Sequence, residues 1–269
     1  MNAQSGFAAH VTTLGQGARP ALALHCTMAF GGAWASVQRA LGRQVSIRAP
    51  DMPSHGGSPD WDEVSDFGDT CFAAALDAMG PEPCDVIGHS FGAAIALRMA
   101  VEHPERLRSL TLFEPVLFAI AMTDDPASLA EHDTSVIEMT RALERGDRAG
   151  AARAFNGMWS EDAKWDTLPE RSRAAMARAV HVVPGTRAFI YEDTSGLLEP
   201  GRLEAVMVPT LVMRGSETLP AIKAVNAGLA RRLGNAREAV ITGAGHMGPI
   251  THPAEVAAEI KLLLARSRS

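Results

Sequence analysis

The chain has 269 residues, of which 46% are hydrophobic and 21% charged, a composition typical of a folded globular protein. Its formal net charge of −6 makes nucleic acids and anionic membrane surfaces unfavourable as main partners. The length favours one domain with an insertion over two independent domains.

The N-terminal segment lacks the basic and apolar stretches of a signal peptide. No apolar run reaches the roughly 18 residues that a membrane span requires. The three cysteines are too few, and odd in number, for a disulfide framework. We therefore expect a protein of the reducing cytoplasm that does not enter a membrane.

Short apolar runs alternate with amphipathic stretches along most of the chain. Amphipathic patterns predict helices over residues 65–79, 92–103 and 253–264. This alternation implies right-handed crossovers, so we predict an α/β fold with a mostly parallel central sheet flanked by helices. The predicted strands are residues 20–25, 45–49, 84–88, 110–113, 210–213 and 238–241.

The pattern changes between residues 116 and 206, where the strand signals vanish. Segments 135–155 and 169–180 are predicted to be helices. We interpret residues 116–206 as a helical cap inserted after the fourth predicted strand. The core then consists of residues 1–115 and 207–269.

The strongest chemical signal is Gly88-His89-Ser90-Phe91-Gly92, a Gly-x-Ser-x-Gly motif between an apolar strand and a helix. A strand that reverses sharply into a helix holds its turn residue in a strained conformation, with the side chain projecting above the sheet. The residues packed around such a turn must be small, as Gly88, Gly92 and Ala93 are. The motif predicts Ser90 as a nucleophile beside a helix N-terminus, whose N–H groups can face a developing oxyanion.

A serine hydroxyl is a weak nucleophile and requires a base within hydrogen-bonding reach. Of the nine histidines, His246 is the best candidate, because its Gly-rich loop follows the last predicted strand and precedes a helix. That position lies at the carboxyl edge of the sheet, where open α/β folds build their sites. His89, inside the motif, is expected to pack against its neighbours or line the pocket.

Together these features resemble the α/β-hydrolase superfamily over essentially the whole chain. Residues 51–58, Asp-Met-Pro-Ser-His-Gly-Gly-Ser, are similar to the Asp-x-Pro-x-His-Gly-x-Ser loop of that family, which is structural. His25-Cys26-Thr27 corresponds to the family's His-Gly-x segment. The resemblance implies an oxyanion hole made by the backbone N–H groups of Phe91 and Thr27, with Met28 as the second choice for the latter.

Cys26 stands where the family usually has glycine. The substitution matters for the backbone, because glycine adopts a positive φ at little cost and cysteine does not. A nucleophilic role for the Cys26 thiol is the weaker interpretation, since no base is adjacent to it in sequence.

The third member of the site departs from the common family pattern. Most members place an aspartate where this chain has Thr218, in Gly215-Ser216-Glu217-Thr218, and a hydroxyl cannot supply a negative charge. Some capped members, among them a group of haloalkane dehalogenases, instead place a glutamate at the end of the strand corresponding to 110–113. We therefore predict Glu114 as the acid, with Glu217 as the alternative. The dehalogenase likeness is limited to geometry, because those enzymes use an aspartate nucleophile.

These residues favour a serine hydrolase that cleaves a carboxylic ester, lactone or thioester through an acyl-enzyme. A carbon–carbon bond hydrolase or a cofactor-free haloperoxidase-like perhydrolase would use the same residues, and a small-molecule receptor on a hydrolase scaffold is the non-enzymatic alternative. No cofactor or metal is expected, because no His/Cys/Asp set has ligand spacing. We expect a small, apolar, uncharged or weakly charged substrate, with His89, Phe118 and Trp159 as candidate binding residues.

Overall fold

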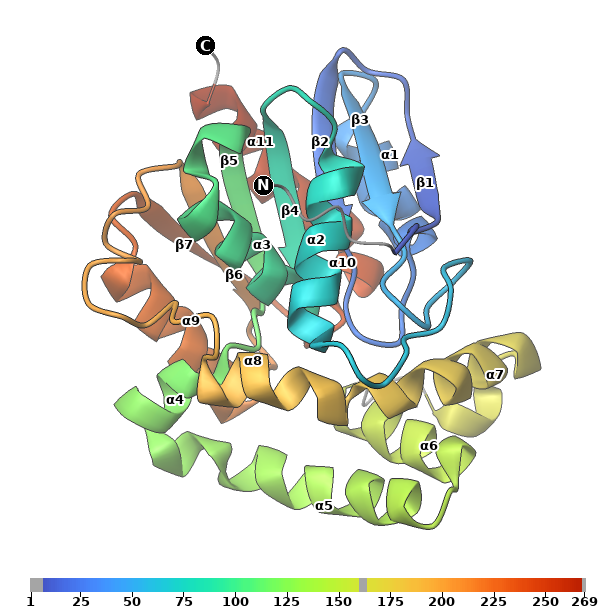
Figure 1. Cartoon of the computed structure of the whole chain (residues 1–269). Coiled ribbons are helices and arrows are strands. Elements are labelled where there is room, and N and C mark those ends of the chain that lie inside the picture. Colours follow the sequence, from blue (N-terminus) through green and yellow to red (C-terminus); the bar gives the residue numbers. More distant parts are fainter. Residues whose placement is uncertain (1–6, 160–163, 268–269) are drawn as a thin grey trace.

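A single sheet of seven strands runs through the centre of the molecule (Figure 1). The computed structural model describes residues 7–159 and 164–267. The spatial order is β1-β3-β2-β4-β5-β6-β7, with β1 antiparallel to β3 and the remaining neighbours parallel. The predicted mostly parallel sheet is thus confirmed. The strands are β1 (Val11–Leu14), β2 (Arg19–Leu24), β3 (Val45–Pro50), β4 (Cys84–His89), β5 (Leu107–Phe113), β6 (Thr210–Gly215) and β7 (Ala236–Ile241).

Helices cover both faces of the sheet, and the strands contribute alternate side chains to the two layers. On β2, Leu22 and Leu24 pack into the core beneath α2 (Phe67–Met79), α3 (Phe91–Glu102) and α9 (Pro220–Arg232). Ala21 and Ala23 of the same strand pack into the core beneath α1 (Ala35–Leu41) and α11 (Pro253–Arg266). A short helix, α10 (Gly248–Thr251), precedes α11. None of the described helices is both long and apolar enough to cross a membrane.

The segment between β5 and β6 contains helices and turns, and no strand among its described residues. Figure 1 shows these helices gathered below the sheet, on the side where the helix α3 begins. They therefore lie over the edge of the sheet that carries the Gly-x-Ser-x-Gly turn. The helices are α4 (Phe118–Asp124), α5 (Ala130–Glu144), α6 (Arg148–Trp159), α7 (Glu170–Ala179) and α8 (Arg187–Glu192).

One predicted helix is wrong in its extent, and one strand was not predicted. The predicted helix 135–155 is two helices, because Gly146 adopts φ +73° after α5 and Asp147 caps α6 by accepting a hydrogen bond from the Gly150 N–H at 2.8 Å. The strand β1 was not predicted, because its four residues (VTTL) give too short a pattern, and they are only half-buried at the edge of the sheet.

Two buried histidines fix the loops at the ends of β2 and β3. The His25 Nε2 accepts a hydrogen bond from the Met52 N–H at 2.9 Å, and the His55 Nε2 accepts one from the Met28 N–H at 2.9 Å. Each Nδ1–H donates to a nearby backbone carbonyl. Both rings are almost fully enclosed, and burial lowers the pKa of His55 to about 3 and lowers that of His25. The neutral rings are needed here, since a protonated ring nitrogen cannot accept a hydrogen bond.

Acid should therefore destabilise the fold through His55. Its pKa falls from an ordinary 6.5 in the unfolded chain to about 3 in the folded one, so between these values the unfolded chain binds the extra proton. The free energy of unfolding should fall as the pH falls, by up to about 1.4 kcal/mol per pH unit from this residue. Urea unfolding followed by circular dichroism between pH 7 and pH 4 measures this slope. His55→Gln should flatten it by about that amount, whereas His252→Gln, at a half-buried turn, should not; equal slopes in the two variants would contradict the assignment.

Candidate active site

Ser90 lies at the sharp turn between β4 and α3, as the motif predicts. Its backbone has φ +57° and ψ −120°, a conformation that costs a non-glycine residue about 1–3 kcal/mol. Its N–H donates to the Phe113 carbonyl at 2.9 Å, which ties the turn to β5. A Cβ on Gly92 would come within 2.5 Å of the backbone oxygens of Leu24 and His25. Glycine at this position therefore lets the turn pack directly against the end of β2.

Glu114 and His246 form a short, buried contact. The carboxylate Oε2 lies 2.7 Å from His246 Nδ1, and Glu114 is fully buried while His246 is 7% exposed. Glu114 immediately follows β5 and has φ +47°, a left-handed conformation. The structure thus places the predicted acid against the predicted base. Because Glu114 engages Nδ1, the other ring nitrogen, Nε2, remains available to accept a proton.

Two further donors satisfy the same carboxylate. The Gly215 N–H donates to Glu114 Oε1 at 2.8 Å, and the Thr218 hydroxyl donates to Oε2 at 2.7 Å. Thr218, at the position where most family members carry the acid, therefore contacts the acid as a hydrogen-bond donor. Glu217, the alternative acid, is exposed and accepts a hydrogen bond from Ser216 at 2.9 Å. The structure does not bring Glu217 to His246.

His89 binds the backbone of the loop that carries His246 and does not line the cavity. It is 3% exposed, and its Nε2–H donates to the His246 carbonyl at 2.8 Å. Burial lowers the pKa of His89 well below its ordinary value, which keeps the ring neutral. His89 does not line the cavity that contains Ser90, so its suggested role in substrate binding is replaced by one in fixing the backbone beside Ser90.

Trp159 joins the helical segment to the histidine. It ends α6, is 9% exposed, and its ring centroid lies 4.1 Å from that of His246. The same indole lines the cavity that contains Ser90, so it separates His246 from part of that space. Among the described residues Ser90 and His246 make no direct hydrogen bond. His89, next to Ser90, binds the His246 carbonyl, and Trp159 packs on His246 and lines the cavity with Ser90. Hydrogen bonds between a nucleophile and its base are often long before substrate binds.

The loop after β2 offers a free backbone N–H at Thr27. The Met28 N–H is already donated to His55, whereas the Thr27 N–H has no partner among the described residues. The Phe91 N–H, at the first turn of α3, is unpaired within the same described part of the chain. Both residues line the cavity with Ser90. Of the two candidates in this loop, Thr27 has the available donor and Met28 does not.

Cys26 does not adopt the positive φ that a glycine there could. The left-handed residue of this loop is Met28, with φ +63°. Cys26 is 4% exposed, and burial raises the pKa of its thiol to about 12. A thiol that stays protonated is a poor nucleophile, so the chemistry of the site does not depend on it.

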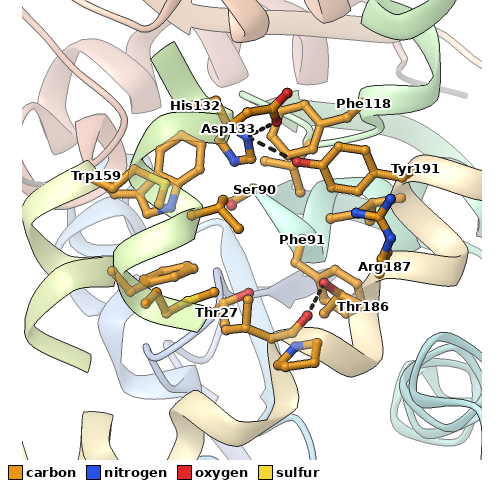
Figure 2. A pocket seen from close by; sticks show the side chains of 18 of the residues that line it. Thr27, Ser90, Phe91, Phe118, His132, Asp133, Trp159, Thr186, Arg187 and Tyr191 are labelled. Atoms are coloured by element: carbon orange, nitrogen blue, oxygen red, sulfur yellow. Dashed lines mark hydrogen bonds and ion pairs between the residues drawn. The ribbon is translucent and has the colours of Figure 1, made fainter. Parts of the chain in front are cut away.

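A cavity of about 550 Å³ lies between Ser90, at the sheet edge, and the helices α4, α5, α6 and α8 (Figure 2). Phe118 and Trp159, both predicted to contact substrate, line it. Most other lining side chains are apolar, among them Val116, Leu129, Met139, Phe155, Met158 and Ile190. Two polar residues outside the predicted substrate contacts, His132 and Tyr191, also line this space. Their position depends on helix packing that no local motif encodes.

Comparison with known proteins agrees with this fold. The lipase LipV of Mycobacterium tuberculosis is 29% identical over 265 residues, covering 94% of this chain and 96% of that protein. A 2-hydroxymuconate semialdehyde hydrolase of a Pseudomonas species is 32% identical over 114 residues, 41% of this chain and 40% of that protein. The crystal structure of a hydrolase from Pseudomonas aeruginosa matches with a TM-score of 0.74 at 20% identity, covering 98% of this chain and 99% of that one.

A family model provides the assignment. It is described as the alpha/beta hydrolase family, and it matches residues 21–259, which include most of β2 and the whole of every strand from β3 to β7. The match also includes Ser90, Glu114 and His246. The chain belongs to the alpha/beta hydrolase family.

Proposed function

We propose that this protein hydrolyses carboxylic esters through an acyl-enzyme on Ser90, with His246 as the base and Glu114 as the acid. The observation that carries the proposal is the buried Glu114–His246 contact of 2.7 Å beside a serine held at a strained turn. A buried carboxylate at Nδ1 fixes the tautomer in which Nε2 is free to accept a proton. It also stabilises the imidazolium that forms when this happens.

The reaction begins when the Ser90 hydroxyl transfers its proton to His246 Nε2 and its oxygen attacks the ester carbonyl. The negative charge on the carbonyl oxygen is stabilised by the free N–H groups of Phe91 and Thr27. His246 then donates the proton to the leaving alcohol, which leaves an ester on Ser90. A water molecule activated by the same histidine attacks this ester, and the carboxylic acid is released.

The cavity supports a small substrate that is largely apolar. Its walls are mainly aliphatic and aromatic side chains, which favour an uncharged group over a strongly anionic one. The named activity of LipV, a lipase that this chain matches over most of its length, supports an ester as the reacting bond.

A second candidate is hydrolysis of a carbon–carbon bond on the same residues. It is favoured by the similarity to a 2-hydroxymuconate semialdehyde hydrolase, whose named substrate contains no ester. That match covers 40% of the semialdehyde hydrolase, whereas the match to LipV covers 96% of the lipase. Ester hydrolysis is therefore the first choice, and parallel assays with an unsaturated semialdehyde and an aryl ester separate the two.

Ser90→Ala should lower kcat/KM for a p-nitrophenyl ester by at least about 10³-fold, because alanine supplies no nucleophile in place of the serine hydroxyl. The release of p-nitrophenol measures the loss. A fluorophosphonate should add its mass to Ser90 in the unsubstituted protein and to no residue in Ser90→Ala, as read by peptide mass spectrometry. Undiminished turnover in the variant would overturn the proposal.

Glu114→Gln and Glu217→Gln form a matched pair, since both remove one negative charge from a glutamate near the same loop. Glu114→Gln should lower kcat by about 10²–10⁴-fold, because an amide cannot stabilise the imidazolium and favours the wrong tautomer. Glu217→Gln should stay within about 3-fold, as expected for an exposed side chain whose carboxylate accepts from Ser216. Steady-state kinetics of both proteins, with circular dichroism as a folding control, make the comparison. A large loss confined to Glu217→Gln would identify Glu217 as the acid instead.

A further inference from the structure

Two polar side chains face the cavity above Ser90 and take no part in the proposed mechanism. His132, on α5, is 4% exposed, and its Nδ1 lies 3.0 Å from the Tyr191 hydroxyl, on α8. Figure 2 shows the two side chains pointing toward one another, with Phe118 beside them. The Phe118 ring centroid lies 4.4 Å from that of His132 and 5.0 Å from that of Tyr191. A hydrogen-bonding pair is thus enclosed in mainly apolar surroundings, where polar groups are costly unless they have partners.

The pair leaves part of its hydrogen-bonding capacity unused. Among the described residues, His132 Nε2 has no partner, and the Tyr191 hydroxyl has none besides His132. Two threonine hydroxyls of this cavity are already engaged, since Thr186 donates to the Val183 carbonyl at 2.8 Å and Thr140 to the Val136 carbonyl at 3.0 Å. The free positions on His132 and Tyr191 are therefore open to a ligand inside this cavity.

The charge state and tautomer of His132 decide what it can bind. Burial lowers the pKa of His132 and raises that of the Tyr191 hydroxyl, so both side chains are neutral at neutral pH. Asp133 Oδ1 lies 3.5 Å from His132 Nδ1, and a carboxylate can only accept, which favours the proton on Nδ1. Nε2 is then an acceptor. With Nδ1–H directed to its oxygen, Tyr191 keeps an O–H that can donate.

We propose that His132 and Tyr191 together recognise a hydroxyl group on the arm of the ester that occupies this cavity. A ligand hydroxyl can donate to His132 Nε2, whereas a ketone oxygen can only accept and finds no donor at that nitrogen. Tyr191, bound to Nδ1 on the other side of the ring, holds the tautomer in which Nε2 accepts. The proposal rests on the proposed esterase function for the reacting bond. It makes the pair a determinant of specificity, since a site with unpaired buried polar groups discriminates against a substrate that leaves them unpaired.

The experiment compares methyl octanoate with methyl hydroxyoctanoates that differ in the position of the hydroxyl, and with the matching methyl oxooctanoates. The ratio of kcat/KM values for the hydroxylated and plain esters gives the selectivity. Calorimetric titration of the same compounds into Ser90→Ala gives the binding ratio without turnover. For the best hydroxylated ester, both the kcat/KM ratio and the binding ratio over methyl octanoate should be about 10, as expected for one well-placed hydrogen bond.

Tyr191→Phe and His132→Phe, alone and combined with Ser90→Ala, should bring both ratios close to one. Tyr191→Phe removes a single oxygen, so it tests the pair even where His132→Phe fails to fold. Thr134→Val is the matched control on the same helix, because its hydroxyl donates to the Ala130 carbonyl at 2.9 Å and is exposed; its ratios should equal those of the parent. A general loss of structure would lower the rates for all esters together and leave the ratio unchanged.

The outcomes separate the two proposals. Hydrolysis of plain and hydroxylated esters at equal rates, or ratios unchanged in Tyr191→Phe and His132→Phe, would overturn the role of the pair and leave the esterase proposal standing. A preference for the oxooctanoates would overturn the hydroxyl as the recognised group. Selective binding by Ser90→Ala, with no ester hydrolysed by the parent protein, would support the pair and overturn the esterase proposal.

Discussion

The site depends on a buried negative charge at the end of β5. Glu114 is removed from solvent, and such a group is strongly destabilising unless donors surround it. Three groups do so: the Gly215 N–H, the Thr218 hydroxyl and His246 Nδ1. They come from the end of β6, the loop after β6 and the loop after β7, so one carboxylate joins the ends of three adjacent strands. The same contacts orient the imidazole.

This arrangement explains why a threonine can stand where most relatives carry the acid. With the carboxylate at Glu114, a second negative charge at position 218 would lie against the first and repel it. A hydroxyl at this position supplies a donor and no charge. In this chain the buried charge therefore stands at the end of β5, and Thr218, on the loop after β6, is its hydrogen-bond partner.

The parts of this structure that could be predicted from sequence are those encoded locally. Apolar runs predict the parallel strands, and the Gly-x-Ser-x-Gly turn predicts Ser90, because both are properties of a few consecutive residues. The break at Gly146 was missed because the amphipathic pattern continues across it. The choice between Thr27 and Met28 was open, since it depends on His55, a residue far along the chain that takes the Met28 N–H. His132 and Tyr191 were missed for the same reason, as they come together only when α5 packs near α8.

The groups proposed to carry the chemistry and those proposed to set selectivity stand on different parts of the fold. Ser90, Glu114 and His246 all stand on the ends of sheet strands or the loops that follow them, whereas His132 and Tyr191 stand on helices inserted between β5 and β6. Substitutions in the inserted helices can therefore change the shape and polarity of the cavity while Ser90, Glu114 and His246 stay in place. Trp159 is where the two parts meet, because its ring packs on His246 at 4.1 Å and on His132 at 5.6 Å. A shift of α6 would move the indole against both His246 and His132, so the packing of Trp159 limits how independently the two parts can vary.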